Sequence, residues 1–469
     1  MPPIPAEGIS AALAADVAGS ASRALSPPAA RAARRALLDG LGVMWAASGL
    51  AAEVAPFITL ATAAATHGHS RVLGTGLCST PALAALANGA MAHALDFEDA
   101  LDGAPLHPNA SLIPAVLALA EARPDTGITL GDLLAAIATG CEVSCRLALS
   151  LRQPLEVGGW YPPPILGAFG AVAGAAALLR LTPQQVVDAW SLLLMQNSCP
   201  GELKHSPGSV LRAVREAFPA QAAVQCALLA REGVAGFEQP LEGRHGFYAL
   251  FAGGQHDATA LQGRSDGQAW IERLSFKPWP CCRGTHPHIA LVLQLAQQHG
   301  LDWRDIDRIG LGGGATQRML AEPLARKQAP ATAIDAKFSL PFCVATALVH
   351  GTVTLVHFSE ASLHDARVLD MAGRTAFTPT AAGVPDNPTG GAVTLQLRDG
   401  RVVQAATDHA PGSPRQPLDD AALVAKFIDC TAQGQRSLPR ERATAFAQDL
   451  LTLPAMTPAA ALLQGLACA

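Results

Sequence analysis

The sequence predicts a mainly α-helical protein that contains a smaller α/β domain. Half of the 469 residues are hydrophobic and only 15% are charged, so a large core is available and global disorder is excluded. Alanine dominates the apolar residues while aromatic residues make up 5%, which favours closely packed helices over strands. The apolar periodicity changes near residue 270. We therefore predict a helical domain at 1–269, an α/β domain at 270–408 and a helical C-terminal return at 409–469.

Helical spacing of apolar residues continues to about residue 265. It predicts helices over 29–48, 80–95, 111–122, 130–151, 164–179, 183–196 and 212–231. Thr80 and Thr182 each precede a proline and are the expected N-caps of their helices. Pro219 is expected to kink or split the last helix. The apolar run Ile165 to Leu179 is shorter than the roughly 20 residues that span a bilayer, so we expect a buried core helix and no membrane contact.

Strands and helices alternate in the second region. Strands are expected over 270–276, 306–311, 392–397 and 401–405, and helices over 287–299 and 339–350. Asp399-Gly400 lies between the last two strands and predicts a hairpin turn. Helical spacing returns over 419–429 and 440–451. This order predicts an α/β domain followed by a helical tail.

Charge and motif content exclude several function classes. The net charge is −5 and no basic face is visible, which argues against nucleic-acid binding. The N-terminal residues lack the pattern of a signal peptide, so we expect a cytoplasmic protein whose ten cysteines are reduced. No cysteine pair has zinc-site spacing, and HExxH, Walker A and strand–helix GxGxxG motifs are missing. The cysteines are therefore expected to be small buried hydrophobic residues rather than metal ligands.

Two segments of the helical region carry candidate catalytic groups. His93 to Asp99 places a histidine and three acids at a predicted helix end, and His107 follows Asp96 by eleven residues. A solvated helix end is the alternative interpretation. Lys204 lies in a loop within a long apolar neighbourhood, where it is either functional or an ordinary surface lysine.

A third segment joins the two regions and is rich in cationic side chains. Lys277, Arg283 and His286 fall within ten residues, and a helix is expected to begin at Pro287. Cations beside a helix N-terminus form an anion site, although a rigid interdomain hinge is the alternative. Further along, Asp335 and Lys337 enter an apolar helix, either as functional groups or as a structural pair.

These segments together, in this order, resemble the MmgE/PrpD family, whose members include 2-methylcitrate dehydratase, cis-aconitate decarboxylase and iminodisuccinate epimerase. The resemblance covers about residues 10 to 450. It rests on Ala87-Asn88-Gly89 to His93 with Asp96-Phe97, His107-Pro108, Gly158-Gly159-Trp160, Lys204 with Gly208, Leu241 to Phe247, Lys277-Pro278 to His286-Pro287, and Ala336 to Phe342.

The resemblance implies a large all-helical domain built from both chain ends and an inserted, smaller α/β lid domain. It also implies a homodimer, a site in the cleft between the domains, and catalysis without a metal or an organic cofactor. The residues that carry over by position are Asp96, His107, Lys204 and Lys277.

Two departures from the family pattern bear on the reaction. Cys282 stands where cis-aconitate decarboxylases have a histidine, which argues against decarboxylation. Trp160-Tyr161 replaces a stretch that usually holds a histidine, so Tyr161 is a candidate to take over its proton transfer.

The function expected from this resemblance is a hydro-lyase that removes a proton next to a carboxylate of a small di- or tricarboxylate. Asp96, His107, Tyr161 and Lys204 are the expected catalytic residues. The expected substrate-binding residues are Lys277, Arg283, His286 and Cys282. The alternatives are an epimerase of a dicarboxylate, a cis-aconitate-type decarboxylase and an inactive binding protein.

Overall fold

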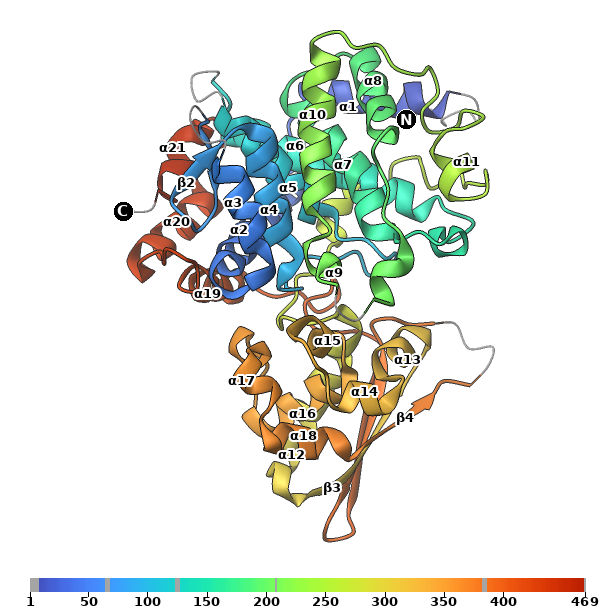
Figure 1. Cartoon of the computed structure of the whole chain (residues 1–469), viewed down its shortest axis with the longest axis vertical. Coiled ribbons are helices and arrows are strands. Elements are labelled where there is room, and N and C mark those ends of the chain that lie inside the picture. The colour runs from blue at the N-terminus through green and yellow to red at the C-terminus, as the bar shows by residue number, and fades with distance from the viewer. Residues whose placement is uncertain (1–7, 64–67, 123–126, 207–208, 382–385, 468–469) are drawn as a thin grey trace. The chain divides into compact units, whose positions relative to one another are not determined.

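The computed structural model describes residues 8–63, 68–122, 127–206, 209–381 and 386–467. Contacts divide the chain into two compact units. A helical unit combines 1–94, 98–274 and 419–469, and a mixed unit combines the short segment 95–97 with 275–418. The prediction of a mainly helical protein with a smaller strand-containing part is confirmed (Figure 1).

The helical unit consists of α-helices joined by short loops and 3₁₀ turns. Its helices are α1 (Ile9–Ser20), α2 (Pro27–Leu50), α3 (Ala55–Ala63), α4 (Pro81–Ala94), α5 (Pro108–Ala122), α6 (Leu130–Leu149), α7 (Pro162–Leu178), α8 (Pro183–Leu194), α9 (Leu211–Val214), α10 (Ala217–Arg231), α11 (Phe247–Phe251), α19 (Asp420–Thr431), α20 (Arg440–Thr452) and α21 (Ala459–Gln464). Two short strands, β1 (Ser70–Val72) and β2 (Leu77–Ser79), pair antiparallel between α3 and α4. Helix α19, the first helix of the C-terminal segment, packs against α2. Lys426 on α19 forms a 2.7 Å ion pair with Asp39 of α2.

Small residues allow the central helices to approach closely, as the alanine-rich composition predicts. A Cβ atom added at Gly140 of α6 would lie 2.5 Å from the carbonyl oxygen of Gly170 on α7. Likewise, a Cβ atom added at Gly170 would lie 2.5 Å from the carbonyl oxygen of Gly140. Because real Cβ atoms do not approach backbone so closely, glycine at these positions permits the α6–α7 contact.

Local signals predicted most helices of this unit correctly. Thr182 caps α8 with Gln185 in a capping box. The helix predicted over 212–231 is split into α9 and α10, as expected, but the break lies before Pro219. Pro219 occupies the first turn of α10, where its missing N–H has no intrahelical partner to lose.

The strand predicted over 270–276 is wrong. Trp270–Arg273 forms a 3₁₀ turn instead. The backbone N–H of Ala269 donates to the Glu272 side chain at 3.0 Å, and that of Trp270 donates to the Glu142 side chain at 3.0 Å. The carboxylates therefore take backbone groups that a sheet partner would otherwise bind.

The mixed unit is built around a four-stranded sheet. Its strands are β3 (Ile306–Gly313), β4 (Thr375–Pro379), β5 (Gly391–Leu397) and β6 (Val402–Thr407), in the order β4-β3-β5-β6. β3 is parallel to β4 and antiparallel to β5, and β5 pairs with β6 as the predicted hairpin. Gly400 has a φ of 89° in its turn, a conformation that glycine adopts without strain.

Helices cover this sheet and complete the core of the mixed unit. They are α12 (His286–His299), α13 (Ala315–Ala321), α14 (Leu324–Gln328), α15 (Ala333–Lys337), α16 (Leu340–His350), α17 (Glu360–Leu363) and α18 (Ala366–Gly373). α12 packs against β5, β6 and α16, and α16 also contacts α18. Asp335 pairs with Arg326 at 3.2 Å, whereas Lys337 is buried near the Phe358 ring. Among the described residues, Asp335 therefore pairs with Arg326 and not with Lys337.

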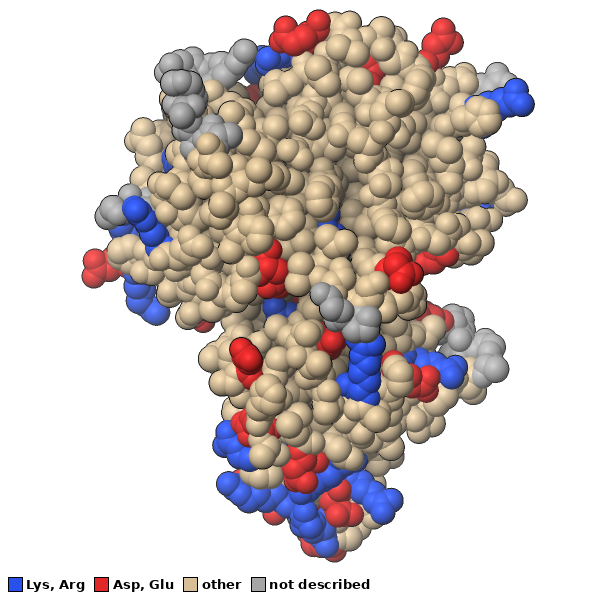
Figure 2. Space-filling view, in the orientation of Figure 1, with Lys and Arg blue, Asp and Glu red and all other residues tan. Residues whose placement is uncertain are grey.

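The surface and the helix lengths bear on possible partners. On the face in Figure 2, side chains of both charges gather over the end of the mixed unit, while most of the helical unit's face is uncharged. Among the described residues, no single helix is long and apolar enough to cross a bilayer. α2 and the segment Ala52–Ala63 reach that length and composition only as a pair bent by 92°.

Candidate functional site

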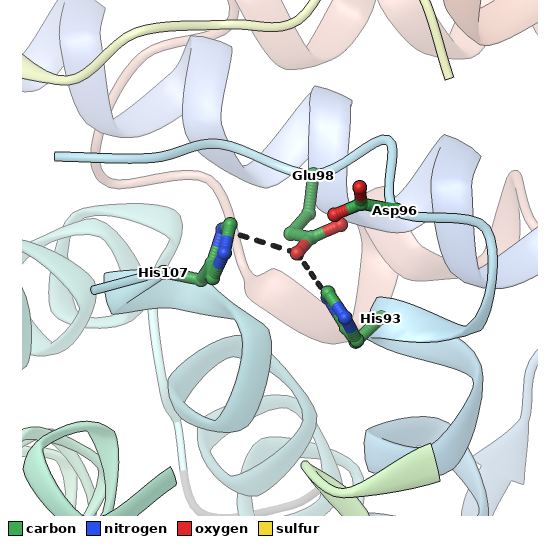
Figure 3. Close-up of side chains that lie close together, drawn as sticks. All are labelled: His93, Asp96, Glu98 and His107. Atoms are coloured by element: carbon green, nitrogen blue, oxygen red, sulfur yellow. Dashed lines mark hydrogen bonds and ion pairs between the residues drawn. The ribbon is translucent and has the colours of Figure 1, made fainter. Parts of the chain in front are cut away.

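A buried carboxylate joins two histidines in the helical unit. His93 lies in the last turn of α4, Glu98 lies in the following loop, and His107 immediately precedes α5. Both imidazoles point toward the Glu98 carboxylate (Figure 3). The Nδ1 atom of His107 lies 3.1 Å from Glu98 Oε1, and Nδ1 of His93 contacts the same oxygen. The side chains of His93 and Glu98 are 0% and 3% exposed, whereas His107 is 17% exposed, so His107 is the member that solvent reaches.

The partners of the two imidazoles determine where their protons lie. His107 Nδ1 is 2.8 Å from the backbone carbonyl of Asp99, an acceptor, so Nδ1 carries a proton. In the neutral imidazole the lone pair is then on Nε2. His93 Nε2 contacts the guanidinium of Arg215, which only donates. His93 is therefore neutral, with its proton on Nδ1 toward Glu98. The Glu98 carboxyl group consequently receives two N–H groups.

Arg215 connects this cluster to a second buried carboxylate. Its Nε lies 3.2 Å from Oε1 of Glu216, and both side chains are almost completely buried. Burial raises the pKa of Glu216 from its ordinary value of 4.5 to about 7, and the nearby charge of Glu98 acts in the same direction. The positive charge of Arg215 opposes this rise. Glu216 therefore changes its charge near neutral pH.

Gly89 allows His93 on α4 to contact Arg215, which lies just before α10. A Cβ atom added at Gly89 of α4 would lie 2.5 Å from the carbonyl oxygen of Glu216 and 3.0 Å from the Cα atom of Ala217. α4 can therefore lie directly against the start of α10. His93, one turn after Gly89, then reaches Arg215.

Tyr161 and Lys204 extend the network. The backbone N–H of Tyr161 donates to the Cys199 carbonyl at 2.7 Å, which holds the N-terminus of α7 beside the loop that carries Lys204. Two cations lie over the Tyr161 ring, Lys204 Nζ at 4.9 Å and the Arg215 guanidinium at 5.1 Å from its centroid. Lys204 also approaches Glu156 at 3.9 Å. Three of the residues predicted from the sequence, His107, Tyr161 and Lys204, are thus linked within one unit.

Asp96 and Lys277 form a second predicted pair, within the mixed unit. Lys277 Nζ donates to Asp96 Oδ1 at 2.7 Å and to the backbone carbonyl of Asp96 at 3.0 Å. Asp96 has a φ of 49°, a left-handed conformation that aspartate tolerates better than most residues. Both side chains are buried, at 0% and 1% exposure, so the pair is an ion pair shielded from solvent.

The remaining predicted binding residues are held by backbone groups of the mixed unit. Arg283 donates to the carbonyls of Ala410 and Pro411. His286 is fully buried, and its Nε2 lies 3.1 Å from the Cys281 carbonyl. Cys282 donates its backbone N–H to the Lys337 carbonyl at 2.9 Å and is partly exposed. These contacts connect the segment to backbone groups of the mixed unit. A substrate-binding role for Arg283, His286 and Cys282 stays a prediction.

Two models of known protein domains together match most of the chain. The MmgE/PrpD N-terminal domain matches residues 11–259, and the MmgE/PrpD C-terminal domain matches residues 279–451. The chain belongs to the MmgE/PrpD family. The predicted resemblance is therefore confirmed.

Curated relatives within this family are distant but match over most of their length. The chain is similar to the cis-aconitate decarboxylase-like protein oryM of Aspergillus oryzae, with 26% identity over 83% of each chain. Cis-aconitate decarboxylase of Mus musculus shares 25% identity over 85% of this chain and 81% of its own. 2-Methylcitrate dehydratase of Salmonella typhimurium shares 25% identity over 76% of this chain and 77% of its own. These relatives are enzymes, and this similarity supports enzymatic activity for the chain.

The His–Glu–His cluster also has the composition of a metal site. The possible ligand atoms of His93, Glu98 and His107 lie within 4.8 Å of one another. A nitrogen that binds a metal must offer a lone pair. Both Nδ1 atoms instead donate protons to oxygen, and His93 Nε2 faces the Arg215 cation. We therefore interpret the cluster in this family member as a hydrogen-bond network.

Sequence reasoning missed the residues that connect this site. His93 and Glu98 lie in the segment that was singled out, but neither was assigned a role. Arg215 and Glu216 lie more than 100 residues further along the chain and are not among the predicted site residues. Adjacent opposite charges in the apolar stretch 213–230 were the available signal. Gly208, which contributes to the resemblance, lies outside the described residues.

Proposed function

We propose that this protein is a lyase, most specifically a hydro-lyase, that acts on a small di- or tricarboxylate by removing a proton next to a carboxylate. The observation that carries the proposal is the orientation of His107 by the buried Glu98. This arrangement leaves Nε2 as the basic nitrogen and places a carboxylate where the imidazolium charge develops. Homologues that act on small carboxylic acids support the substrate class.

The proposed reaction assigns a task to each residue. His107 Nε2 takes the proton from carbon, and Glu98 stabilises the imidazolium that results. Lys204 and Lys277 bind substrate carboxylates and stabilise the enolate-like charge, with Asp96 holding Lys277 in place. Tyr161 donates a proton to the leaving hydroxyl group, which departs as water while the carbon–carbon double bond forms. His107 then releases the proton it gained and Tyr161 takes one up, so that both groups return to their starting states.

Decarboxylation is the second candidate, because several of the relatives are cis-aconitate decarboxylases. In that reaction CO₂ leaves instead of a proton, and protonated His107 supplies the proton to the resulting carbanion. The same lysines would stabilise the negative charge. Cys282, at the position where decarboxylases carry histidine, remains the argument against this reaction.

Proton NMR of the purified enzyme in D₂O tests the proposal. The panel contains 2-methylcitrate, citrate, cis-aconitate and substituted succinates. New vinyl signals from a hydroxy acid are expected for a hydro-lyase, whereas itaconate-type methylene signals from cis-aconitate would establish the decarboxylase. Exchange of a C–H signal without a new product would move the assignment to an epimerase. A panel that gives no change would contradict the proposed substrate class.

The family resemblance also supports a homodimer. Size-exclusion chromatography with light scattering measures the mass directly. A particle of twice 48.2 kDa is expected, and a mass of one chain at micromolar concentration would contradict the proposal.

A further inference from the structure

Glu216 is a buried acid that the proposed reaction does not use directly. Glu216 is 0% exposed and immediately precedes α10. A Cβ atom added at Gly167 of α7 would lie 3.8 Å from Glu216 Oε2 and 2.9 Å from the Ser111 hydroxyl on α5, so the acid lies where α5, α7 and α10 meet. Such burial of a carboxyl group is costly unless the group has a specific partner. Arg215 is that partner, at 3.2 Å.

We propose that Glu216 is a positioning residue that acts on His107 through Arg215, His93 and Glu98, and that its proton sets the charge of this network. The inference rests on the proposed role of His107 as the base. Four successive contacts carry it: Glu216 to Arg215, Arg215 to His93, His93 to Glu98, and Glu98 to His107.

The charges around Glu216 give the direction of its effect. Among the described residues, the titratable and charged groups that act on it or contact its partner Arg215 include His93 from α4, Glu98 from the following loop, Cys199 from the loop before Lys204, and Tyr161 from the start of α7. Burial raises the pKa of the Cys199 thiol to about 12, so Cys199 stays neutral. The charges that remain near Glu216 are therefore those of Arg215 and Glu98.

Ionised Glu216 compensates the charge of Arg215, and the network then holds a net negative charge beside His107. Protonated Glu216 leaves Arg215 uncompensated, which weakens the effect of Glu98 on His107. Glu216→Gln, a neutral replacement of the same shape, is therefore expected to lower the pKa of His107. At an effective dielectric constant near 20, one charge at about 10 Å shifts a pKa by roughly one unit.

Histidine NMR measures this shift without any need for turnover. The protein is labelled with ¹³C at histidine Cε1, and the His107 signal is assigned by its loss in His107→Asn. In E216Q, the titration midpoint of His107 is expected to fall by about half a pH unit to one pH unit. Glu121→Gln is the matched control, because Glu121 is also a buried glutamate that pairs with an arginine, Arg71, at 3.2 Å. The control is expected to leave the His107 midpoint unchanged.

An unchanged His107 midpoint in folded E216Q would overturn the inference, even if the enzyme has the proposed activity. The expected shift in a protein that turns over no carboxylate would support the network and contradict the proposed function. If E216Q does not fold, ¹³C labelling of glutamate carboxyl carbons in the unaltered protein decides the question. A glutamate signal that titrates near pH 7 and moves in His107→Asn is expected. If all glutamate signals titrate below about pH 5.5, the inference is wrong.

Discussion

Removal of the Glu98 charge is the most direct test of the proposed base. Glu98→Gln keeps the shape of the side chain but replaces the carboxylate that receives Nδ1–H of His107 at 3.1 Å. Two unit charges about 4 Å apart interact by about 4 kcal/mol at an effective dielectric constant of 20. This energy corresponds to about three pKa units, or about a thousandfold in rate if the imidazolium forms fully in the transition state.

The assay is the initial rate of substrate conversion between pH 5 and 9, followed by NMR. E98Q is expected to lower kcat by 10²- to 10³-fold and to move the acidic limb of the profile to lower pH, with a smaller change in KM. Glu121→Gln serves again as the control for loss of a buried carboxylate and is expected to retain activity. A folded E98Q enzyme with more than about a third of the normal kcat and an unshifted profile would refute the assignment of His107 and Glu98.

Four further outcomes are expected. Lys277→Met should destabilise the mixed unit by about 3–5 kcal/mol, because it removes the cation that pairs with the buried Asp96 carboxylate. The double variant with Asp96→Asn should recover much of the melting temperature but should not recover turnover. Gly140→Ala should cost about 1–3 kcal/mol in thermal unfolding, because its Cβ atom would lie 2.5 Å from backbone, whereas Gly373→Ala meets no atom within 4 Å and should cost little. The folded protein holds the Glu216 proton up to about pH 7, while the unfolded chain releases it near 4.5, so this group makes the protein less stable as pH rises through that range. E216Q should therefore gain about 3 °C in melting temperature over the parent between pH 4.5 and 7.5, and a constant difference would contradict the raised pKa. Dialysis against EDTA should leave turnover unchanged, and a loss restored by a divalent ion would contradict the hydrogen-bond interpretation of the site.

The sequence determined the secondary structure where local chemistry decides it. Thr182 and Gln185 satisfy backbone groups at the start of α8, and Gly300 ends α12 in a left-handed conformation with a φ of 62°. The Asp399-Gly400 turn joins β5 and β6 as expected. These signals act over a few residues, so they can be read without knowledge of the rest of the fold. The error at 270–276 arose because a distant carboxylate, Glu142, binds the backbone of Trp270.

The sequence also determined which residue types are available for catalysis, and the ordered motifs indicated the family. It did not determine which carboxylate acts on His107. Asp96, Glu98 and Asp99 lie within four residues of one another, and only the folded chain assigns the Asp96 side chain to Lys277 and that of Glu98 to the histidines.

Tertiary structure alone decided that Arg215 and Glu216 belong to the network. They follow His93 by 122 and 123 residues, and they reach it because Gly89 lets α4 lie against the backbone of Glu216 and Ala217. The charge state of Glu216 depends on the adjacent Arg215 and on burial, and the burial arises only when α5, α7 and α10 pack together. The sequence thus supplied the reactive groups, and packing determined their pairing and their protonation.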